Sequence, residues 1–573
     1  MKNLLIITNG YIEYDKIEKY LNNKEFKIKI LPLQINDKLK LYNFKDFLID
    51  ESAYFNNDSH QYLLEKSENI RNIIRDALII KYNQNSIYSL RIWFSNLFLK
   101  EFVNFKLKII YSIIKVIEIY NFEDAIFMSP DEYFNNEIIK FIFDSKKIPL
   151  EIFTTKISKK KYKKKFNYLL PQLNNFLFNL KSNVLITSKN YNCYEIAKNN
   201  INNNSKIFIL SENTSITSSL KNFFFNKLRT IIVIPIMLKK ISYKFNNDHF
   251  KKNFPEILNF NFCNIFEKKL IELYESKFEQ TLKKCEFLSN LFTNQSPRAI
   301  FSTDSDYING FIGEYSYLFN FHSFCITHGT HTFPKNNNEF LYQKEIGENV
   351  ILNFYPYIIS QSIFCDKFLE KFTINSKIIK TKPLVYNFGN FSSPFNKTIL
   401  HASTTKTENS YKFWGVETIE EYISSIVDVH EVTQSQGFKL IVKPHPSLKK
   451  ILTLQELQNL LDIDDIHFTD NNFNQCLKLS DILVSFSSTT IEETLYNKKP
   501  VILYDRNNRY NHLDAQELNF QKNIKYSQPY FYINNIKILN ENLPIIYNLH
   551  KENKFEYKDI FLGHTNSLDI SKI

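Results

Sequence analysis

Glycine is scarce in this chain, with only nine residues in 573. The glycine-rich loops that often bind phosphate are missing: no GxGxxG follows the first predicted strand, and no GxxxxGK followed by Ser or Thr occurs anywhere. Seven of the nine glycines lie between Gly310 and Gly437, so the N-terminal two hundred residues have almost no position suited to tight turns with positive φ. These absences disfavour a P-loop NTPase and a dehydrogenase with a glycine fingerprint.

Cysteine is also rare, and its residues are scattered. They form no CxxC pair and no zinc-like spacing with histidine. A structural zinc site and a disulfide framework are therefore disfavoured, and we expect reduced thiols, as in the cytoplasm. The six cysteines are Cys193, Cys263, Cys285, Cys325, Cys365 and Cys476.

Long apolar runs are missing as well. The longest strongly apolar stretch, Ile231 to Leu238, is interrupted by Pro235 and is far shorter than the ~20 residues of a membrane span. The apolar run that follows Met1 is too short for a signal peptide and is predicted to be a buried strand. We therefore expect a cytoplasmic protein, soluble or peripherally attached to the inner face of the cytoplasmic membrane.

Positive charge exceeds negative charge, since 72 Lys and Arg residues against 60 Asp and Glu residues give a net charge of +12. Such an excess favours an anionic partner. Basic residues gather in the segments Lys156 to Lys165 and Leu228 to Lys252. No nucleic-acid-binding motif accompanies them, so we predict no nucleic-acid partner. A solvated loop is the plain alternative, and we favour contact with an anionic membrane surface or an acidic glycan.

Short apolar strands alternate with helical segments over most of the chain. Hydrophobic residues make up 43% and charged residues 23%, which is typical of soluble globular domains, and the length suggests two to four of them. Strands separated by helices predict right-handed crossovers and parallel sheets, hence the α/β class. The clearest predicted strands are 125–128, 299–303, 323–327, 398–402, 438–442, 481–486 and 501–504.

The pattern also predicts a domain organisation. We expect an N-terminal Rossmann-like domain at 1–345, with a mostly helical insertion at about 151–295. A linker at 346–395 would lead to a C-terminal domain at 396–545, and the tail 546–573 would return to the N-terminal domain.

A strand-to-helix turn at Ser487, Ser488 and Thr489 is a candidate anion site. Ligands of parallel sheets bind beyond the carboxyl ends of strands, where backbone amides and hydroxyls at a helix start can contact phosphate. Ordinary N-capping is the plain alternative. Glu492, in the first turn of that helix, could accept hydrogen bonds from a ribose, or merely complement the helix dipole.

The sequence Lys443-Pro444-His445-Pro446 ends the preceding strand. Two prolines hold the backbone extended and would present His445 in a fixed orientation. A protonated imidazole next to a phosphate makes a strong, charge-assisted hydrogen bond. A surface turn with an incidental histidine is the plain alternative.

These elements together resemble the C-terminal domain of GT-B glycosyltransferases that build bacterial surface polysaccharides. The resemblance rests on KPHP and, about forty residues later, on SDILVSFSSTTIEETLYNKKPVILYD. It is strongest to CDP-glycerol glycerophosphotransferases, bacterial sialyl- and polysialyltransferases and capsule Kdo transferases, in which an HP motif and a serine pair bind the phosphate of a CMP- or CDP-activated donor. It covers about residues 296 to 510. The matching residues are His445 with Pro446, Ser487 with Ser488, and Glu492.

The resemblance implies two Rossmann-like domains that face across a cleft. It also implies a metal-independent glycosyltransferase without cofactor, which moves an acidic sugar such as sialic acid or Kdo from a CMP-sugar to a bacterial surface glycan or glycolipid. Phosphate transfer from a CDP-polyol, use of a UDP-sugar and a non-catalytic assembly role are the alternatives. The nucleotide-binding residues would be Lys443, His445, Pro446, Ser487, Ser488, Thr489 and Glu492.

The base that deprotonates the acceptor is expected in the N-terminal domain. Asp304 and His328 follow two neighbouring predicted strands, so we predict them, with His445, as the catalytic residues. A solvated loop position is the plain alternative for both. Polysialyltransferases take their base from an acidic-acidic-glycine element, which finds no match here because Glu123-Asp124 is followed by alanine.

Overall fold

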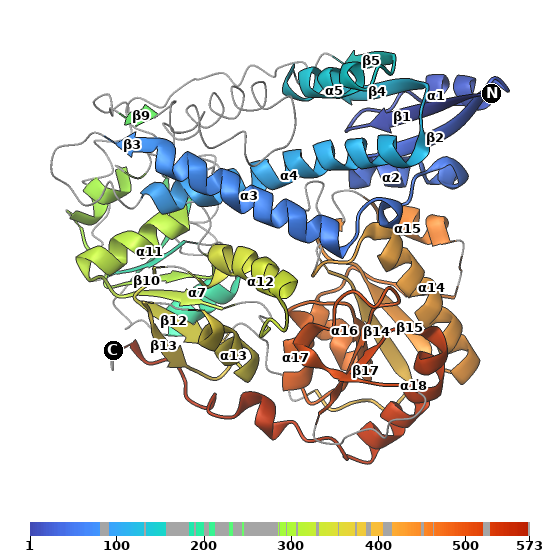
Figure 1. Cartoon of the computed structure of the whole chain (residues 1–573). Coiled ribbons are helices and arrows are strands. Elements are labelled where there is room, and N and C mark those ends of the chain that lie inside the picture. The colour runs from blue at the N-terminus through green and yellow to red at the C-terminus, as the bar shows by residue number, and fades with distance from the viewer. Residues whose placement is uncertain are drawn as a thin grey trace.

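Three parallel β-sheets with flanking helices make up the chain (Figure 1), so the predicted α/β class is confirmed. The computed structural model describes residues 1–80, 91–130, 133–155, 183–187, 191–199, 206–211, 229–232, 243–245, 285, 287–293, 295–304, 308–327, 332–352, 354–372, 375–384, 391–404, 415–448, 452–461, 463, 465–519 and 528–570. We refer to 1–155 as the N-terminal unit, 183–384 as the middle unit and 391–551 as the C-terminal unit.

The N-terminal unit contains a four-stranded sheet of order β2-β1-β4-β5. Its strands are β1 Lys2–Thr8, β2 Phe26–Pro32, β4 Asp124–Pro130 and β5 Leu150–Thr155. Its helices are α1 Tyr14–Leu21, α2 Ile35–Lys40, η1 Tyr42–Phe47, η2 Glu51–Ala53, α3 Asn57–Ala77, α4 Arg91–Tyr120 and α5 Tyr133–Ser145. The long helices α3 and α4 pack side by side and extend from this sheet over the middle unit (Figure 1).

The middle unit contains a seven-stranded sheet of order β13-β12-β11-β10-β6-β7-β8. Its strands are β6 Val184–Ile186, β7 Ile207–Ser211, β8 Arg229–Ile232, β10 Ala299–Ser302, β11 Ser323–Ile326, β12 Tyr357–Ser360 and β13 Lys377–Lys380. Its helices are α7 Tyr191–Asn199, α11 Ile308–Phe319, α12 Asn337–Val350 and α13 Ile363–Lys371.

The division of the chain differs from the expected one in two places. The expected helical insertion at 151–295 supplies β6, β7 and β8 of the middle sheet, and the expected linker at 346–395 supplies β12, α13 and β13. These strands have three to five residues, too few for an alternating pattern to show in the sequence. A separate antiparallel pair joins β3 Leu78–Ile80 to β9 Tyr243–Phe245.

The C-terminal unit contains the other seven-stranded sheet, of order β16-β15-β14-β17-β18-β20-β19. Its strands are β14 Thr398–Ala402, β15 Lys439–Lys443, β16 His467–Phe468, β17 Ile482–Ser485, β18 Val501–Tyr504, β19 Gln516–Glu517 and β20 Tyr530–Ile533. Its helices are α14 Ile419–Gln436, α15 Leu454–Leu461, α16 Phe473–Leu479, α17 Thr490–Tyr496, η5 His512–Asp514 and α18 Ile536–Lys551.

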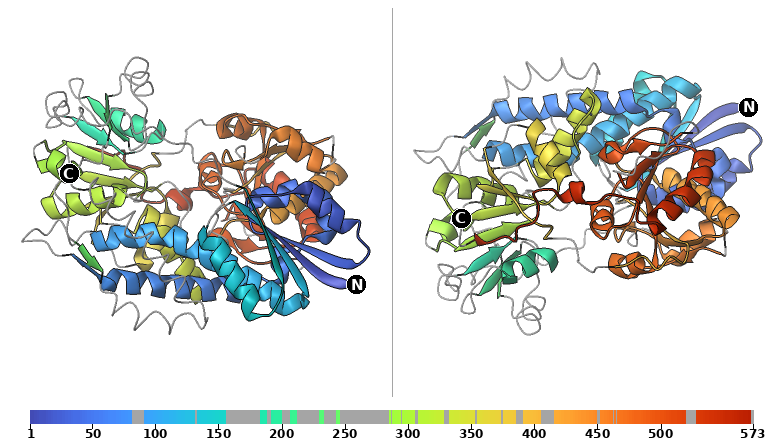
Figure 2. Two further views of the ribbon diagram at one scale, coloured as in Figure 1. Left: turned by 90° about the horizontal axis from the view of Figure 1, so that it is seen from above. Right: turned by 90° about the horizontal axis from the view of Figure 1, so that it is seen from below.

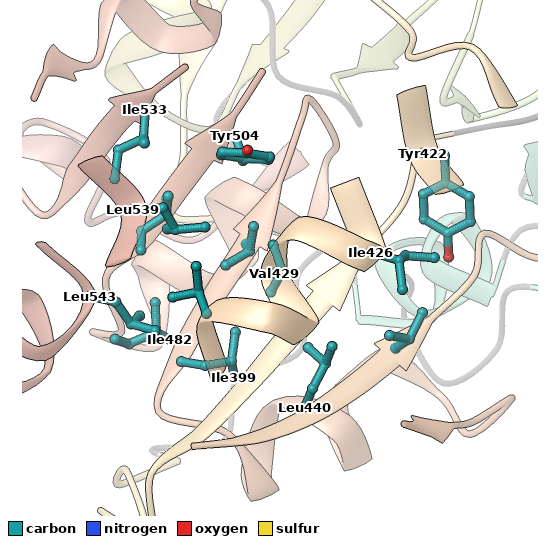
Figure 3. Close-up of a cluster of buried hydrophobic side chains, with 14 of the residues drawn as sticks. Ile399, Tyr422, Ile426, Val429, Leu440, Ile482, Tyr504, Ile533, Leu539 and Leu543 are labelled. Atoms are coloured by element: carbon teal, nitrogen blue, oxygen red, sulfur yellow. The ribbon is translucent and has the colours of Figure 1, made fainter. Parts of the chain in front are cut away.

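Burial of apolar side chains on both faces holds the C-terminal sheet in place. Ile399 and Ile482 of neighbouring strands pack against Val429 of α14 and Leu543 of α18 (Figure 3). Helix α14 starts at a capping box, in which Thr418 accepts the Glu421 amide proton, and ends at Gly437 with φ of 68°. This fixes the start of α14 at the edge of the sheet where β14 ends.

The tail of the chain leaves the C-terminal unit and packs on the middle unit (Figure 2). After η6, Lys558–Phe561, the carbonyl of Asn566 accepts the Lys382 amide proton at 2.7 Å, and Leu568 joins the core of the middle sheet. The Tyr547 hydroxyl of α18 donates to the Phe395 carbonyl at 2.9 Å. The tail therefore contacts the outgoing chain at Lys382, and α18 contacts it at Phe395.

The predictions about membrane contact fall mostly on undescribed residues. Within the described ranges, no helix is both long and apolar enough to cross a bilayer. The basic segment 156–165 lies outside these ranges, and only β8 and β9 are described within 228–252.

Candidate active site

The candidate site lies where the strand order of the C-terminal sheet reverses. In chain order the sheet begins with β14, and β15 and β17 pair with it on opposite sides. Such a reversal leaves a crevice beyond the carboxyl ends of the two central strands, where ligands of open α/β sheets bind. Ser403 follows β14, His445 follows β15, and Ser487 follows β17.

His445 is held by two neighbours and is partly exposed. Its backbone amide donates to Ser403 Oγ at 2.8 Å. Its ring Nδ1 accepts the Ser447 amide proton at 3.1 Å and lies 2.8 Å from Ser447 Oγ. Because an amide only donates, Nδ1 is an acceptor, and the neutral ring carries its proton on Nε2. The geometry thus fits a neutral ring with an Nε2–H donor, whereas the protonated ring that we expected would lose the Ser447 bond.

The other predicted residues of this motif differ in exposure. Lys443, the last residue of β15, is partly buried, whereas Pro446, directly after His445, is exposed. The end of this strand thus carries two side chains that can donate to an anion, those of Lys443 and His445.

The serine pair has two distinct environments. Ser487 is buried and donates its hydroxyl proton to the Gly415 carbonyl, which ties the end of β17 to the loop before α14. Ser488 Oγ accepts the Thr490 amide proton at 3.3 Å, a bond that does not use its own proton. Thr489 is exposed and makes no side-chain cap bond. Thr489 itself has helical φ and ψ, so Ser488, whose hydroxyl accepts the amide proton two residues on, is the residue that caps this helix, and the capping alternative holds for Ser488.

Glu492 lies at the contact with the middle unit. Its side chain is 1% exposed and close to Cys365 on α13. Burial, together with the Glu492 charge, raises the pKa of the Cys365 thiol to about 12. Contact between Glu492 and a ribose would require the two units to separate at this point.

Asp304 follows β10 in the middle sheet, which has its own reversal of strand order between β6 and β10. Its Oδ1 accepts from Asn309 Nδ2 at 2.5 Å, which orients the carboxylate. Across the reversal, Thr187 Oγ1 donates to Ser302 Oγ at 2.8 Å. His328, the other candidate base, lies outside the described residues.

The carboxyl ends of the two large sheets meet at Tyr510. This residue follows β18, and its hydroxyl lies 3.2 Å from Thr332 Oγ1 and accepts from Gln343 Nε2 at 2.9 Å. Thr332 comes after β11, the strand next to β10. The Lys335 ammonium is 2.6 Å from the Asp514 carboxylate in the same contact. The units that carry Asp304 and His445 are thus packed at the edges where both residues lie.

Several residues around the site were not predicted. Ser403 and Ser447 orient His445, and Gly415 positions Ser487. Arg509 Nη2 donates to the Glu421 carboxylate at 2.5 Å, at the start of α14. The one sequence signal that could have revealed such residues is a polar side chain just after a buried strand, and Ser403, directly after β14, has it.

No protein-family model matches this sequence, and comparison with curated proteins finds no similar one. Among solved structures, the chain is similar to UDP-GlcNAc 2-epimerase from Neisseria meningitidis bound to UDP-GlcNAc, with 13% identity over 66% of this chain and 93% of that chain, at a TM-score of 0.37. The chain is also similar to the wall teichoic acid polymerase TagF soaked with CDPG, with 11% identity over 69% of this chain and 89% of that chain, at a TM-score of 0.38. It is similar to UDP-GlcNAc 2-epimerase from Methanocaldococcus jannaschii in complex with UDP-GlcNAc and UDP, with 14% identity over 64% of this chain and 92% of that chain, at a TM-score of 0.34. At these scores the function has to be argued from this chain's own residues.

Proposed function

We propose that this chain transfers a sugar from a nucleotide-activated donor whose phosphate binds at the end of β15. The observation that carries the proposal is the environment of His445. Because Nδ1 accepts the Ser447 amide proton, Nε2–H is the ring's donor at the edge of the sheet where ligands bind. Negative charge grows on the departing phosphate oxygen, so a hydrogen bond from Nε2 strengthens in the transition state.

The donor that we favour is a CMP-linked acidic sugar, and the acceptor a bacterial surface glycan or glycolipid. The acceptor oxygen bonds to the anomeric carbon while the bond from that carbon to the phosphate oxygen breaks, and CMP leaves with the electron pair. The hydroxyl proton passes to Asp304 or His328 as general base. Lys443 and Ser488 assist His445 in binding the phosphate, without a metal ion. This choice of donor rests on the motif resemblance and on the placement of these side chains.

A panel of nucleotides tests the donor. Thermal shifts measured with CMP, CDP and UDP at equal concentration should be largest for CMP. Preference for CDP would favour phosphate transfer from a CDP-polyol, and preference for UDP would favour a UDP-sugar. If no nucleotide shifted the melting temperature, a non-catalytic assembly protein would be the better description.

His445→Ala tests the proposal itself. We expect kcat to fall roughly ten- to a hundred-fold, since a hydrogen bond to a charged group contributes roughly 1.5–3 kcal/mol. The melting temperature should be unchanged, because the ring is partly exposed. His445→Asn should recover part of the rate, since its amide still donates. His467→Ala, at an exposed histidine of β16, is the matched control. A wild-type rate in His445→Ala would refute the proposal.

A further inference from the structure

A groove leads from the start of α14 to the surface of helices α3 and α4. Two adjoining pockets form it, with volumes of about 610 and 650 Å³, within the range of ligand sites. Phe55, Asn56 and Asp58 belong to the walls of both, so the two pockets adjoin at these residues. Arg509 lies in the wall of the first pocket, and Tyr111 in the wall of the second.

The first pocket begins beside the candidate donor site. The Arg509 guanidinium lies 4.9 Å from the centre of the Phe486 ring, and its Nη2 donates to the Val416 carbonyl at 3.3 Å. Phe486 directly precedes Ser487, and Gly415, which accepts from Ser487, directly precedes Val416. A chain lying in the groove therefore has one end within reach of the site where transfer would occur.

Two tyrosines line the far part of the groove. Tyr62 on α3 and Tyr111 on α4 are partly exposed, with ring centres 5.9 Å apart. The Tyr111 hydroxyl donates to Ser59 Oγ at 2.9 Å, and Ser59 in turn donates to Asn56 Oδ1 at 2.9 Å. This chain of hydrogen bonds fixes the Tyr111 ring before any ligand arrives, which lowers the entropic cost of binding.

The charges of the groove disfavour an anionic occupant. Six carboxylates line the two pockets against three cations, and each cation already has a carboxylate partner. Arg509 is paired with Glu421, Lys115 with Glu118 at 2.9 Å, and Arg506 with Asp428 at 3.5 Å. Lys38 and Lys108, which are not part of the pocket walls, pair with Glu51 and Glu420. The negative excess is therefore small, and what disfavours a polyanion is that every lining cation is already paired with a carboxylate. The carboxylates are Asp50, Glu51, Asp58, Glu118, Glu420 and Glu421.

We propose that this groove binds a neutral oligosaccharide segment. The apolar C–H face of a sugar ring stacks on a tyrosine ring once it displaces the ammonium that lies over it, Lys66 over Tyr62 or Lys115 over Tyr111. Sugar hydroxyls donate to carboxylates such as Asp58. Resting on the proposed function, the segment is the part of the acceptor glycan that lies behind the hydroxyl to be glycosylated. The enzyme then holds its acceptor by a neutral stretch, even where the sugar it adds is acidic.

The test is an array of neutral, sialylated and phosphorylated oligosaccharides probed with the labelled full-length protein. We expect neutral glycans to bind, and Tyr62→Ala to weaken binding about tenfold, which corresponds to about 1.4 kcal/mol for the lost stacking. Tyr62→Phe, which keeps the ring, should bind like the wild type. Tyr317→Ala, at an exposed tyrosine of α11, is the matched control.

Nucleotide thermal shifts of the same variants separate this proposal from the donor proposal. Tyr62→Ala should lose glycan binding and keep its nucleotide shift, whereas His445→Ala should keep glycan binding. If Tyr62→Ala fails to fold, its lowered melting temperature will show it, and Asp58→Asn then replaces it in the glycan-binding test. The groove proposal is overturned if no neutral glycan binds, if anionic glycans bind better, or if binding survives both Tyr62→Ala and Asp58→Asn.

Discussion

The middle and C-terminal sheets share one strand arrangement but carry opposite chemistry at their reversals. In both, the first strand in chain order is flanked by the second and third on one side and by the fourth onward on the other. At the C-terminal reversal, His445 and Ser488 each accept a backbone amide proton, so that Nε2–H and the hydroxyl proton are the donors of these side chains. A carboxylate, Asp304, occupies the middle one. Under the proposed function, the same backbone frame binds phosphate in one unit and accepts a proton in the other.

Among the predicted substitutions, Asp304→Asn should have the largest effect on the transfer rate. Removal of a general base typically lowers the rate by 10²–10⁴-fold, so we expect kcat to fall about a hundred-fold or more. Nucleotide thermal shifts should stay at the wild-type value, because the change is confined to the middle unit. Asp46→Asn, at an exposed position of η1, controls for the loss of charge. If Asp304→Asn kept the wild-type rate, Asp304 would be excluded as the base, and His328 would be the proposed base instead.

Separate alanine variants should distinguish the two serines. Ser488→Ala should weaken nucleotide binding about tenfold, because it removes a hydroxyl beside the proposed phosphate. It should also cost about 1 kcal/mol of stability, because that hydroxyl accepts the Thr490 amide proton at the start of α17. Ser487→Ala should cost about 1 kcal/mol of stability, since it breaks a buried hydrogen bond to Gly415, and leave nucleotide binding unchanged. Calorimetric titration with CMP and chemical denaturation measure the two effects. Equal effects on nucleotide binding in both variants would show that the serines act as one unit.

Acid should loosen the tail from the middle unit. Burial alone would raise the pKa of Asp366, but hydrogen bonds from His564, Lys380 and Ser360 lower it to about 2. A lowered pKa stabilises the fold above the ordinary value of 3.8 and ceases to do so as pH falls toward 2. We expect a loss of about 2 kcal/mol between pH 4 and pH 2, read from denaturation curves. Asp366→Asn should flatten that part of the pH dependence, and an unchanged slope would contradict the assignment.

Membrane binding is the smallest effect that we expect. If the basic segments 156–165 and 228–252 contact anionic lipid, sedimentation with phosphatidylglycerol vesicles should decline steeply as salt rises. Each lysine near the surface contributes about 1 kcal/mol at low salt. Vesicles of neutral phosphatidylcholine are the control. Binding that does not respond to salt would leave these segments as solvated loops.

The strands of the two sheets also differed in how accurately they could be predicted from the sequence. Strands β14, β17 and β18 lie within one residue of the predicted ranges, because runs such as Val501 to Tyr504 are apolar throughout and buried on both faces. Strand β6 has three residues, and the edge strand β13, Lys377–Lys380, is largely exposed, so neither leaves such a run. His445 could be predicted from its motif. Ser403 had only the general signal of a polar residue just after a buried strand, and its bond to His445 joins strand ends that lie far apart in the sequence. Ser447 could not be predicted, because its bond to the ring forms in a short local turn that the sequence does not distinguish.

The paired chain segments between the middle and C-terminal units constrain how the two units can move. One segment leaves the middle unit after Lys382, the other returns beside it at Asn566, and they meet again where Ser393 Oγ lies 2.6 Å from His550 Nε2. Two contacts between the outgoing and returning parts of the chain resist twisting and sliding of the units more than one contact would. We therefore expect any separation of the units at Glu492 to be a rotation about the line through these two contacts.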